Sequence, residues 1–154
     1  TMGRHCGYLA LRSGVIGGAE RVLNPEVDTP LEAVADTITE AYVRGKTHAI
    51  ILVAEGASHN ASQVAAYLAE HAPLLQTRVT ILGHIQRGGR PTAFDRLLAA
   101  RFGVLAVESL IKGESGNMVA LDGREISLVP LGEVTAHKRE ANLDYFAMAK
   151  MLAK

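Results

Sequence analysis

The sequence has no tryptophan, a single cysteine and only 5% aromatic residues. Because Cys6 has no partner for an internal disulfide, the chain suits a reducing compartment, and we expect a cytoplasmic protein. Neither sign of charge dominates, since 16 basic and 16 acidic side chains cancel, and this excludes a global field that attracts nucleic acid or an anionic membrane. The longest apolar run, Ala49 to Ala54, is far too short to cross a bilayer, and the first residues show no signal-peptide pattern.

What the sequence does contain is a regular alternation of helical and strand patterns. The clearest helix begins at Thr29 and Pro30, where Glu32 completes a predicted capping box, and stops near Gly45. The other predicted helices are 8–11 ended by Gly14, a helix capped by Asn60 or Ser62 and running to Ala69, 91–112 and 142–152. The predicted strands are 22–23, 48–54, 78–82, and a hairpin of 118–121 and 126–129 around the Asp122-Gly123 turn.

This alternation predicts an α/β fold, a three-layer αβα arrangement with a mainly parallel sheet. Ligands of such sheets gather at the carboxyl ends of the strands. Glu55 and the pair Gly83-His84 each come directly after a predicted strand. We therefore expect these two places to converge on one ligand.

The stretch from Gly83 to Arg96 has the composition of an anion site. Its glycines allow close backbone approach, and a helix begins near Pro91 with unpaired N–H groups and a partial positive charge. Arg87 and Arg90 add forked donors that match phosphate or carboxylate oxygens, and His84 adds a further donor. A positively charged surface loop is the alternative interpretation.

Gly83 to Arg96 also resembles the sugar-phosphate signature of the phosphofructokinase family. Three further stretches resemble the same family in the same order, and they are 2–7 (Met-Gly-Arg-His-Cys-Gly), 17–20 (Gly-Gly-Ala-Glu) and the strand ending at Glu55. The resemblance runs from Met2 to about Val129. It implies a phosphofructokinase-like fold, phosphoryl transfer from ATP to fructose 6-phosphate with Mg²⁺ in the full enzyme, and a homotetramer.

Residue by residue, the resemblance implies a site for fructose 6-phosphate. The matching positions are Met2, Gly3, Arg4, Glu55, Arg78, His84, Ile85, Gln86 and Arg87. Arg4 would offset the negative charge on the phosphoryl group while it is transferred, a task that suits a side chain of constant charge. Arg78 would reach the sugar phosphate from a neighbouring subunit. The plainer alternatives are a solvated terminal arginine for Arg4, a solvated loop charge for Glu55 and a surface charge for Arg78.

A second site, for an ADP or phosphoenolpyruvate effector, is implied in the same way. The matching positions are Gly18, Ala19, Glu20, Arg44, Lys46, Thr47 and His48. Arg44 stands where many regulated members carry lysine, and both Arg44 and Lys46 could instead complement the dipole of a helix C-terminus. We assign no metal to this chain, because His59, His71 and His137 lack ligand spacing, and we expect Cys6 to be structural.

The family's nucleotide loop, its Gly-Gly-Asp turn and its Thr-Ile-Asp segment with the catalytic base do not occur here. We therefore expect a C-terminal portion, inactive alone, with 1–82 and 135–154 forming the sugar and effector domain. Residues 83–134 would pack on an absent nucleotide domain and expose apolar surface without it. A pyrophosphate-dependent relative and a non-catalytic sugar-phosphate-binding module remain as alternatives.

Overall fold

The computed structural model describes residues 1–137, 141–142 and 144–152 and divides the chain into two compact units. Unit 1 comprises Thr1–Arg87 and Arg139–Lys154, and unit 2 comprises Gly88–Lys138. The predicted return of the chain at 135–154 and the predicted helix at 142–152 fall partly outside the described residues. We predicted that the chain passes from one part to the other at 82/83 and returns at 134/135. The boundaries between the two compact units lie at 87/88 and 138/139.

Unit 1 is built on a βαβ element. Strand β1 (Arg21–Leu23) pairs in parallel with β2 (Ile51–Val53), and α2 (Leu31–Val43) connects them. The remaining helices of unit 1 are α1 (Tyr8–Gly17), α3 (Ala61–His71), the 3₁₀ turn η1 (Gly83–Arg87) and α6 (Asp144–Leu152). The capping box that starts α3 uses Asn60 and Gln63, which decides between the two predicted caps in favour of Asn60.

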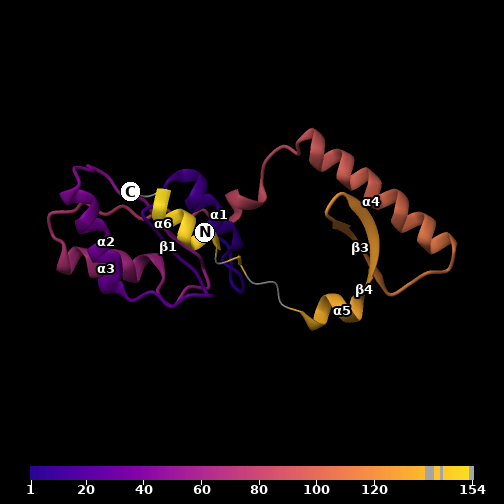
Figure 1. Cartoon of the computed structure of the whole chain (residues 1–154), viewed down its shortest axis with the longest axis horizontal. Coiled ribbons are helices and arrows are strands. Elements are labelled where there is room, and N and C mark those ends of the chain that lie inside the picture. Colours follow the sequence, from indigo (N-terminus) through magenta and orange to yellow (C-terminus); the bar gives the residue numbers. More distant parts are fainter. Residues whose placement is uncertain (138–140, 143, 153–154) are drawn as a thin grey trace. The chain divides into compact units, whose positions relative to one another are not determined.

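The two faces of this small sheet carry different helices, so unit 1 has three layers (Figure 1). Val22 and Leu52 face a core formed with α1 and α6, where Tyr145 and Phe146 also pack. Leu23 faces a second core formed with α2 and α3. Alternate strand residues point to opposite faces, which is why adjacent apolar residues serve two cores. The predicted αβα arrangement is confirmed.

Four local predictions about unit 1 were wrong in detail. Helix α1 continues past Gly14 to Gly17, because Gly18 (φ 65°) ends it in the left-handed conformation. Thr29 is buried and makes no cap bond to α2. Strand β2 covers three residues instead of 48–54.

The fourth wrong prediction is the strand at 78–82, which has no strand structure. A strand needs a neighbour for its N–H and C=O groups. The parallel sheet has only two strands in the described part of the chain, and neither pairs with 78–82. Val79 and Ile81 are accordingly exposed.

Unit 2 holds one long helix, a hairpin and a short helix. They are α4 (Ala93–Ile111), β3 (Asn117–Asp122), β4 (Glu125–Pro130) and α5 (Leu131–Ala136), of which α5 was not predicted. Helix α4 begins with a capping box, since Thr92 and Asp95 exchange bonds between side chain and backbone. Strands β3 and β4 pair antiparallel, which confirms the predicted hairpin.

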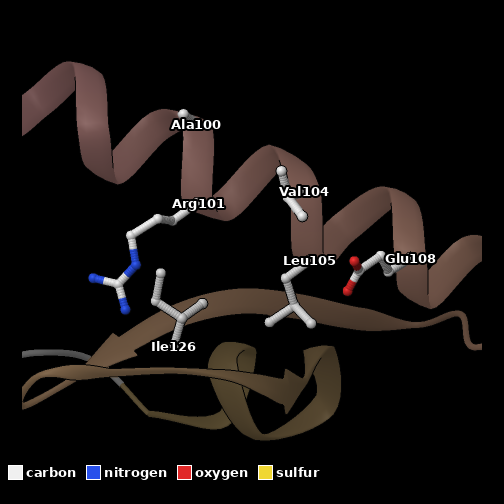
Figure 2. A pocket seen from close by; sticks show the side chains of 6 residues that line it. All are labelled: Ala100, Arg101, Val104, Leu105, Glu108 and Ile126. Carbon is white, nitrogen blue, oxygen red and sulfur yellow. The ribbon is translucent and has the colours of Figure 1, made fainter.

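Helix α4 leaves much of its apolar surface uncovered, as we expected for residues 83–134. Phe94, Leu97 and Leu110 of this helix are each more than 60% exposed. An open groove of about 430 Å³ lies between α4 and the hairpin, lined by Ala100, Arg101, Val104, Leu105, Glu108 and Ile126 (Figure 2). The hairpin therefore covers part of the apolar stripe, and nothing in the described part of the chain covers the rest.

Candidate functional site

The carboxyl end of β2 carries the candidate site, and the first residues of the chain lie along it. The Glu55 N–H donates to the Thr1 carbonyl over 2.9 Å, and the Gly56 N–H donates to the Gly3 carbonyl over 3.2 Å. Both bonds join segments more than fifty positions apart. They hold the Met2–Arg4 turn against the loop that follows β2.

Gly56 makes this close approach sterically allowed. A Cβ added there would overlap the Arg4 carbonyl oxygen and lie 2.6 Å from the Arg4 carbonyl carbon. Backbone atoms have little freedom to give way, so only glycine fits at this position without moving the turn.

Arg4 and Glu55 form an ion pair across the site, with Nε and Oε1 3.4 Å apart. Their side chains are 75% and 43% exposed, so the pair contributes at most about 1 kcal/mol to stability. The effect of the pair is to orient the Arg4 and Glu55 side chains. Both groups face solvent and are free to exchange this contact for a ligand, the carboxylate by accepting from hydroxyls and the guanidinium by donating to an anion.

The η1 turn meets the other side of the Met2–Arg4 turn. The Met2 N–H donates to Gln86 Oε1 over 2.6 Å. The Met2–Arg4 turn therefore contacts both Glu55 and the segment beginning at Gly83, and the convergence of these two places on one ligand stays a prediction.

Three more of the predicted sugar-phosphate-binding residues lie next to Gln86. His84, Ile85 and Arg87 belong to the same short turn as Gln86, and all three are exposed. Arg78 is also exposed, and no bond within the described residues ties it to this group. The structure thus joins Met2, Gly3, Arg4, Glu55 and Gln86 directly, places His84, Ile85 and Arg87 beside them, and leaves Arg78 separate.

The second predicted region centres on Glu20, which is buried. Glu20 Oε1 accepts from Lys46 Nζ over 3.1 Å, and Oε2 accepts from the Ile50 N–H over 2.6 Å. Burial raises the pKa of this carboxyl, but the hydrogen bonds from Ile50 and Lys46 outweigh it and hold the pKa below its ordinary value of 4.5. Glu20 is an ionised carboxylate with a donor at each oxygen.

The lowered pKa predicts a specific pH dependence. A carboxyl with a lowered folded-state pKa adds stability that is full above its ordinary value and is lost as pH falls through the folded value. We expect Glu20→Gln to lower the free energy of unfolding at pH 7 by about 1–3 kcal/mol. The difference from the unchanged chain should shrink as pH falls below about 4.5, when the parent's Glu20 becomes protonated.

Urea unfolding from pH 7 to pH 3 measures this. Glu70→Gln, at an exposed position of α3, is the matched control and should follow the parent at every pH. A gap that stays constant with pH would show that Glu20 acts through packing and not through its charge.

The other predicted effector positions are arranged less closely. Arg44 lies 3.7 Å from Glu40 within α2 and its C-cap, and Thr47 and His48 are exposed. Gly18 caps α1, while Ala19 is buried in the core with its N–H donated to Gly14. The structure therefore brings Glu20 and Lys46 together but shows Ala19 as a core residue.

One functional candidate was missed entirely. Glu26, in the turn after β1, accepts from the backbone N–H groups of Gly7 and Ala141. A glutamate after a proline carries no local signal for such a role, because its partners are distant in sequence. Only the folded arrangement reveals it.

In residues 1–137, 141–142 and 144–152, no three His, Cys, Asp or Glu side chains lie close enough to hold a metal ion. None of the helices over the same residues is long and apolar enough to cross a membrane.

Known proteins resemble the chain along its whole length. A family model described as phosphofructokinase matches residues 1–110. ATP-dependent 6-phosphofructokinase of Paenibacillus macquariensis is 42% identical over 154 residues, which cover 100% of this chain and 48% of that protein. The enzyme of the same name from Thermotoga neapolitana is 45% identical over 153 residues, which cover 99% and 47%. The chain spans about half the length of the curated relatives it matches.

Solved structures agree on the fold. Phosphofructokinase of Pichia pastoris has 32% identity and a TM-score of 0.76, with 99% of this chain and 19% of that chain covered. A pyrophosphate-dependent phosphofructokinase from Nitrosospira multiformis has a TM-score of 0.71 at 22% identity, with 86% and 38% covered, and shares the fold alone. The predicted phosphofructokinase-like α/β fold is confirmed.

Proposed function

Because the chain belongs to the phosphofructokinase family, we propose that it is the C-terminal, sugar-phosphate-binding part of a 6-phosphofructokinase. The whole enzyme transfers a phosphoryl group from ATP to the 1-hydroxyl of fructose 6-phosphate and forms fructose 1,6-bisphosphate. The observation that carries this proposal is the junction of the Met2–Arg4 turn with Glu55 on one side and Gln86 on the other. It gathers a carboxylate for hydroxyls and cations for phosphate in one place.

Each site residue takes a role that its chemistry supports. Glu55 accepts from sugar hydroxyls, and Met2, Gly3, Ile85 and Gln86 contact the sugar. His84 and Arg87 bind the 6-phosphate, with Arg78 added from a neighbouring subunit of a tetramer. Arg4 stabilises the charge that develops on the transferred phosphoryl group.

The phosphoryl donor is proposed to bind mainly outside this chain. The family's nucleotide loop and Gly-Gly-Asp turn do not occur in this sequence, and we therefore assign ATP and Mg²⁺ mainly to the rest of a longer protein. The similar curated proteins are named as ATP-dependent, which favours ATP over pyrophosphate. Glycolysis in the cytoplasm is the expected setting.

The two compact units suggest a division of labour. Unit 1 carries the whole candidate site, whereas unit 2 carries the uncovered stripe of α4 and the groove of Figure 2. We assign unit 2 to packing on the nucleotide-binding part of the longer protein. The exposed large apolar side chains of α4, from Val107 at 56% to Ile111 at 81% exposure, are too large a set to leave in water.

Effector binding is proposed around Lys46 and Arg44. An ADP or phosphoenolpyruvate phosphate would compete with Glu20 for Lys46, since the two are paired at 3.1 Å in this structure. Thr47 and His48 add exposed polar groups beside them. Gly18 and Ala19 would contribute backbone only.

Thermal unfolding with added ligand tests the sugar site. We expect fructose 6-phosphate at about 100 times its dissociation constant to raise stability by about 2.7 kcal/mol, or several degrees in Tm. Arg87→Ala should remove most of this rise, because the phosphate loses a charged fork.

Lys112→Ala, at an exposed cation of unit 2, is the control and should keep the full rise. Fructose without phosphate should produce none. An equal rise with fructose 6-phosphate in the Arg87→Ala chain would contradict the assigned phosphate contact, and no rise in the unchanged chain would contradict the site.

A further inference from the structure

Glu26 is a carboxylate surrounded by backbone donors. The Gly7 N–H donates to Oε1 over 2.8 Å and to Oε2 over 3.0 Å, and the Ala141 N–H donates to Oε1 over 3.0 Å. Burial raises the pKa of this carboxyl, but the bonds from Gly7 and Ala141 outweigh it and keep the pKa below its ordinary value of 4.5. Glu26 is therefore an anion bonded to two pieces of main chain, with the Cys6 side chain as a further hydrogen-bond partner.

The Gly7 bond lies at the start of α1. Gly7 is the N-cap residue of this helix and offers no side chain for capping, so the Glu26 carboxylate supplies the negative charge that a helix N-terminus favours. The fit is tight. A Cβ on Gly7 would overlap Asn24 Cβ and lie 2.8 Å from Glu26 Oε2.

Only a few residues separate Gly7, which is bonded to Glu26, from the candidate site at Gly3 and Arg4. Gly3 is packed against the Cys6 carbonyl, since a Cβ on Gly3 would lie 2.8 Å from that oxygen. Gly3 in turn accepts from the Gly56 N–H, and its neighbour Arg4 pairs with Glu55. Residues 3–7 thus form one compact loop, bonded at one end to the site and at the other to Glu26.

The Ala141 bond brings in the C-terminal part of the chain. Ala141 is buried in the core shared with α1, and Tyr145 and Phe146 of α6 pack on the same core. Glu26 is therefore the point where the loop before α1 and the segment before α6 are bonded to a single side chain. These partners are 19 and 115 positions away from it.

We propose that Glu26 is a positioning residue for the sugar-phosphate site: it holds Gly7 and so places Arg4, and it makes that placement depend on the segment at Ala141. This inference rests on the proposed function for the meaning of Arg4 and on the observed bonds for the tether itself. Glu26 does not touch the site, so its effect must pass through the loop of residues 3–7. A change in Glu26 should consequently alter the site without melting the rest of unit 1.

Hydrogen–deuterium exchange on the 154-residue chain tests the tether without any ligand. In Glu26→Ala, we expect faster exchange in the peptides that contain Gly7 and Ala141, and no change in the peptide of α3, which packs on the other core. Glu26→Gln keeps an oxygen for both N–H donors and should fall between the parent and the alanine variant. Glu70→Gln should match the parent. Faster exchange everywhere, or nowhere, overturns the positioning role.

Fructose 6-phosphate binding tests the link to the site through a double-mutant cycle. We expect Glu26→Ala to weaken binding by roughly 10- to 100-fold, since small displacements of a binding group are costly, and Glu26→Gln to weaken it by less than about threefold. Once Arg4 is replaced by alanine, adding Glu26→Ala should have little further effect, because both act through one group. Effects that multiply fully would assign Glu26 to general stability instead.

The two measurements separate the possible failures. If the unchanged chain does not bind fructose 6-phosphate but Glu26→Ala accelerates exchange only at Gly7 and Ala141, the proposed function is wrong and the tether stands. If the unchanged chain binds the sugar phosphate and Glu26→Ala binds it equally well, the proposed function stands and the positioning role is wrong.

Discussion

Mixed with the separately produced remainder of a related enzyme, the chain should restore phosphorylation of fructose 6-phosphate by ATP, while either part alone should give none. The N-terminal half of the Thermotoga neapolitana enzyme is a suitable complement, since that enzyme is 45% identical to this chain over 47% of its own length. Phosphoryl transfer depends on positioning and charge stabilisation, and under the proposed function neither half binds both substrates. We expect a rise of at least roughly 100-fold over the sum of the separate halves.

The uncovered face of α4 provides an independent readout of the same experiment. A dye that fluoresces on apolar surfaces should bind the isolated chain and be displaced when the complement is added, because Leu97, Val104 and Ile111 become covered. Arg4→Ala is the control that should keep assembly and lose activity. Assembly without turnover in the unchanged chain, together with tight sugar-phosphate binding, would favour the non-catalytic binding module over the kinase.

Gly56→Ala is expected to lower both the stability of unit 1 and the affinity of the candidate site. The new Cβ would overlap the Arg4 carbonyl oxygen, so the Met2–Arg4 turn must leave the loop after β2. Overpacking of this kind costs about 1–3 kcal/mol of folding free energy. Because Arg4 moves with the turn, fructose 6-phosphate binding should fall by more than roughly tenfold.

Chemical unfolding and ligand titration of the same variant measure both effects. Gly17→Ala is the matched control, since a Cβ there meets nothing within 4 Å and the residue lies in the last turn of α1. It should leave stability within about 0.5 kcal/mol and binding unchanged. Normal binding by Gly56→Ala would show that the close approach of the two segments is dispensable for the site.

Local signals in the sequence were enough for much of unit 1. Helix α2 and the strands on either side of it followed from apolar spacing and turn residues, and Asn60, one of two predicted caps, marks the start of α3. These features depend on neighbours within a few positions. The same local rules failed at 78–82, where a strand-like composition meets no strand to pair with.

For the candidate site, too, the sequence predicted the local features but not the long-range contacts. Residue types and their order in four short stretches pointed to a phosphofructokinase, and the family comparison confirmed that assignment. The sequence did not show that the Met2 N–H would bond to Gln86, that Gly56 would lie against Arg4, or that Lys46 would pair with Glu20. Each of these contacts joins residues at least 26 positions apart.

By itself, then, the sequence determined the alternation of elements, the family and the chemical types available for binding, because these depend on local spacing and on side-chain identity. Only the tertiary structure decided which of those side chains share a site and which residue holds the site in place. Glu26 is the clearest case, since its partners Gly7 and Ala141 come from opposite ends of the chain. Long-range backbone bonds of this kind follow from how the layers of unit 1 pack, and a linear pattern carries no record of that packing.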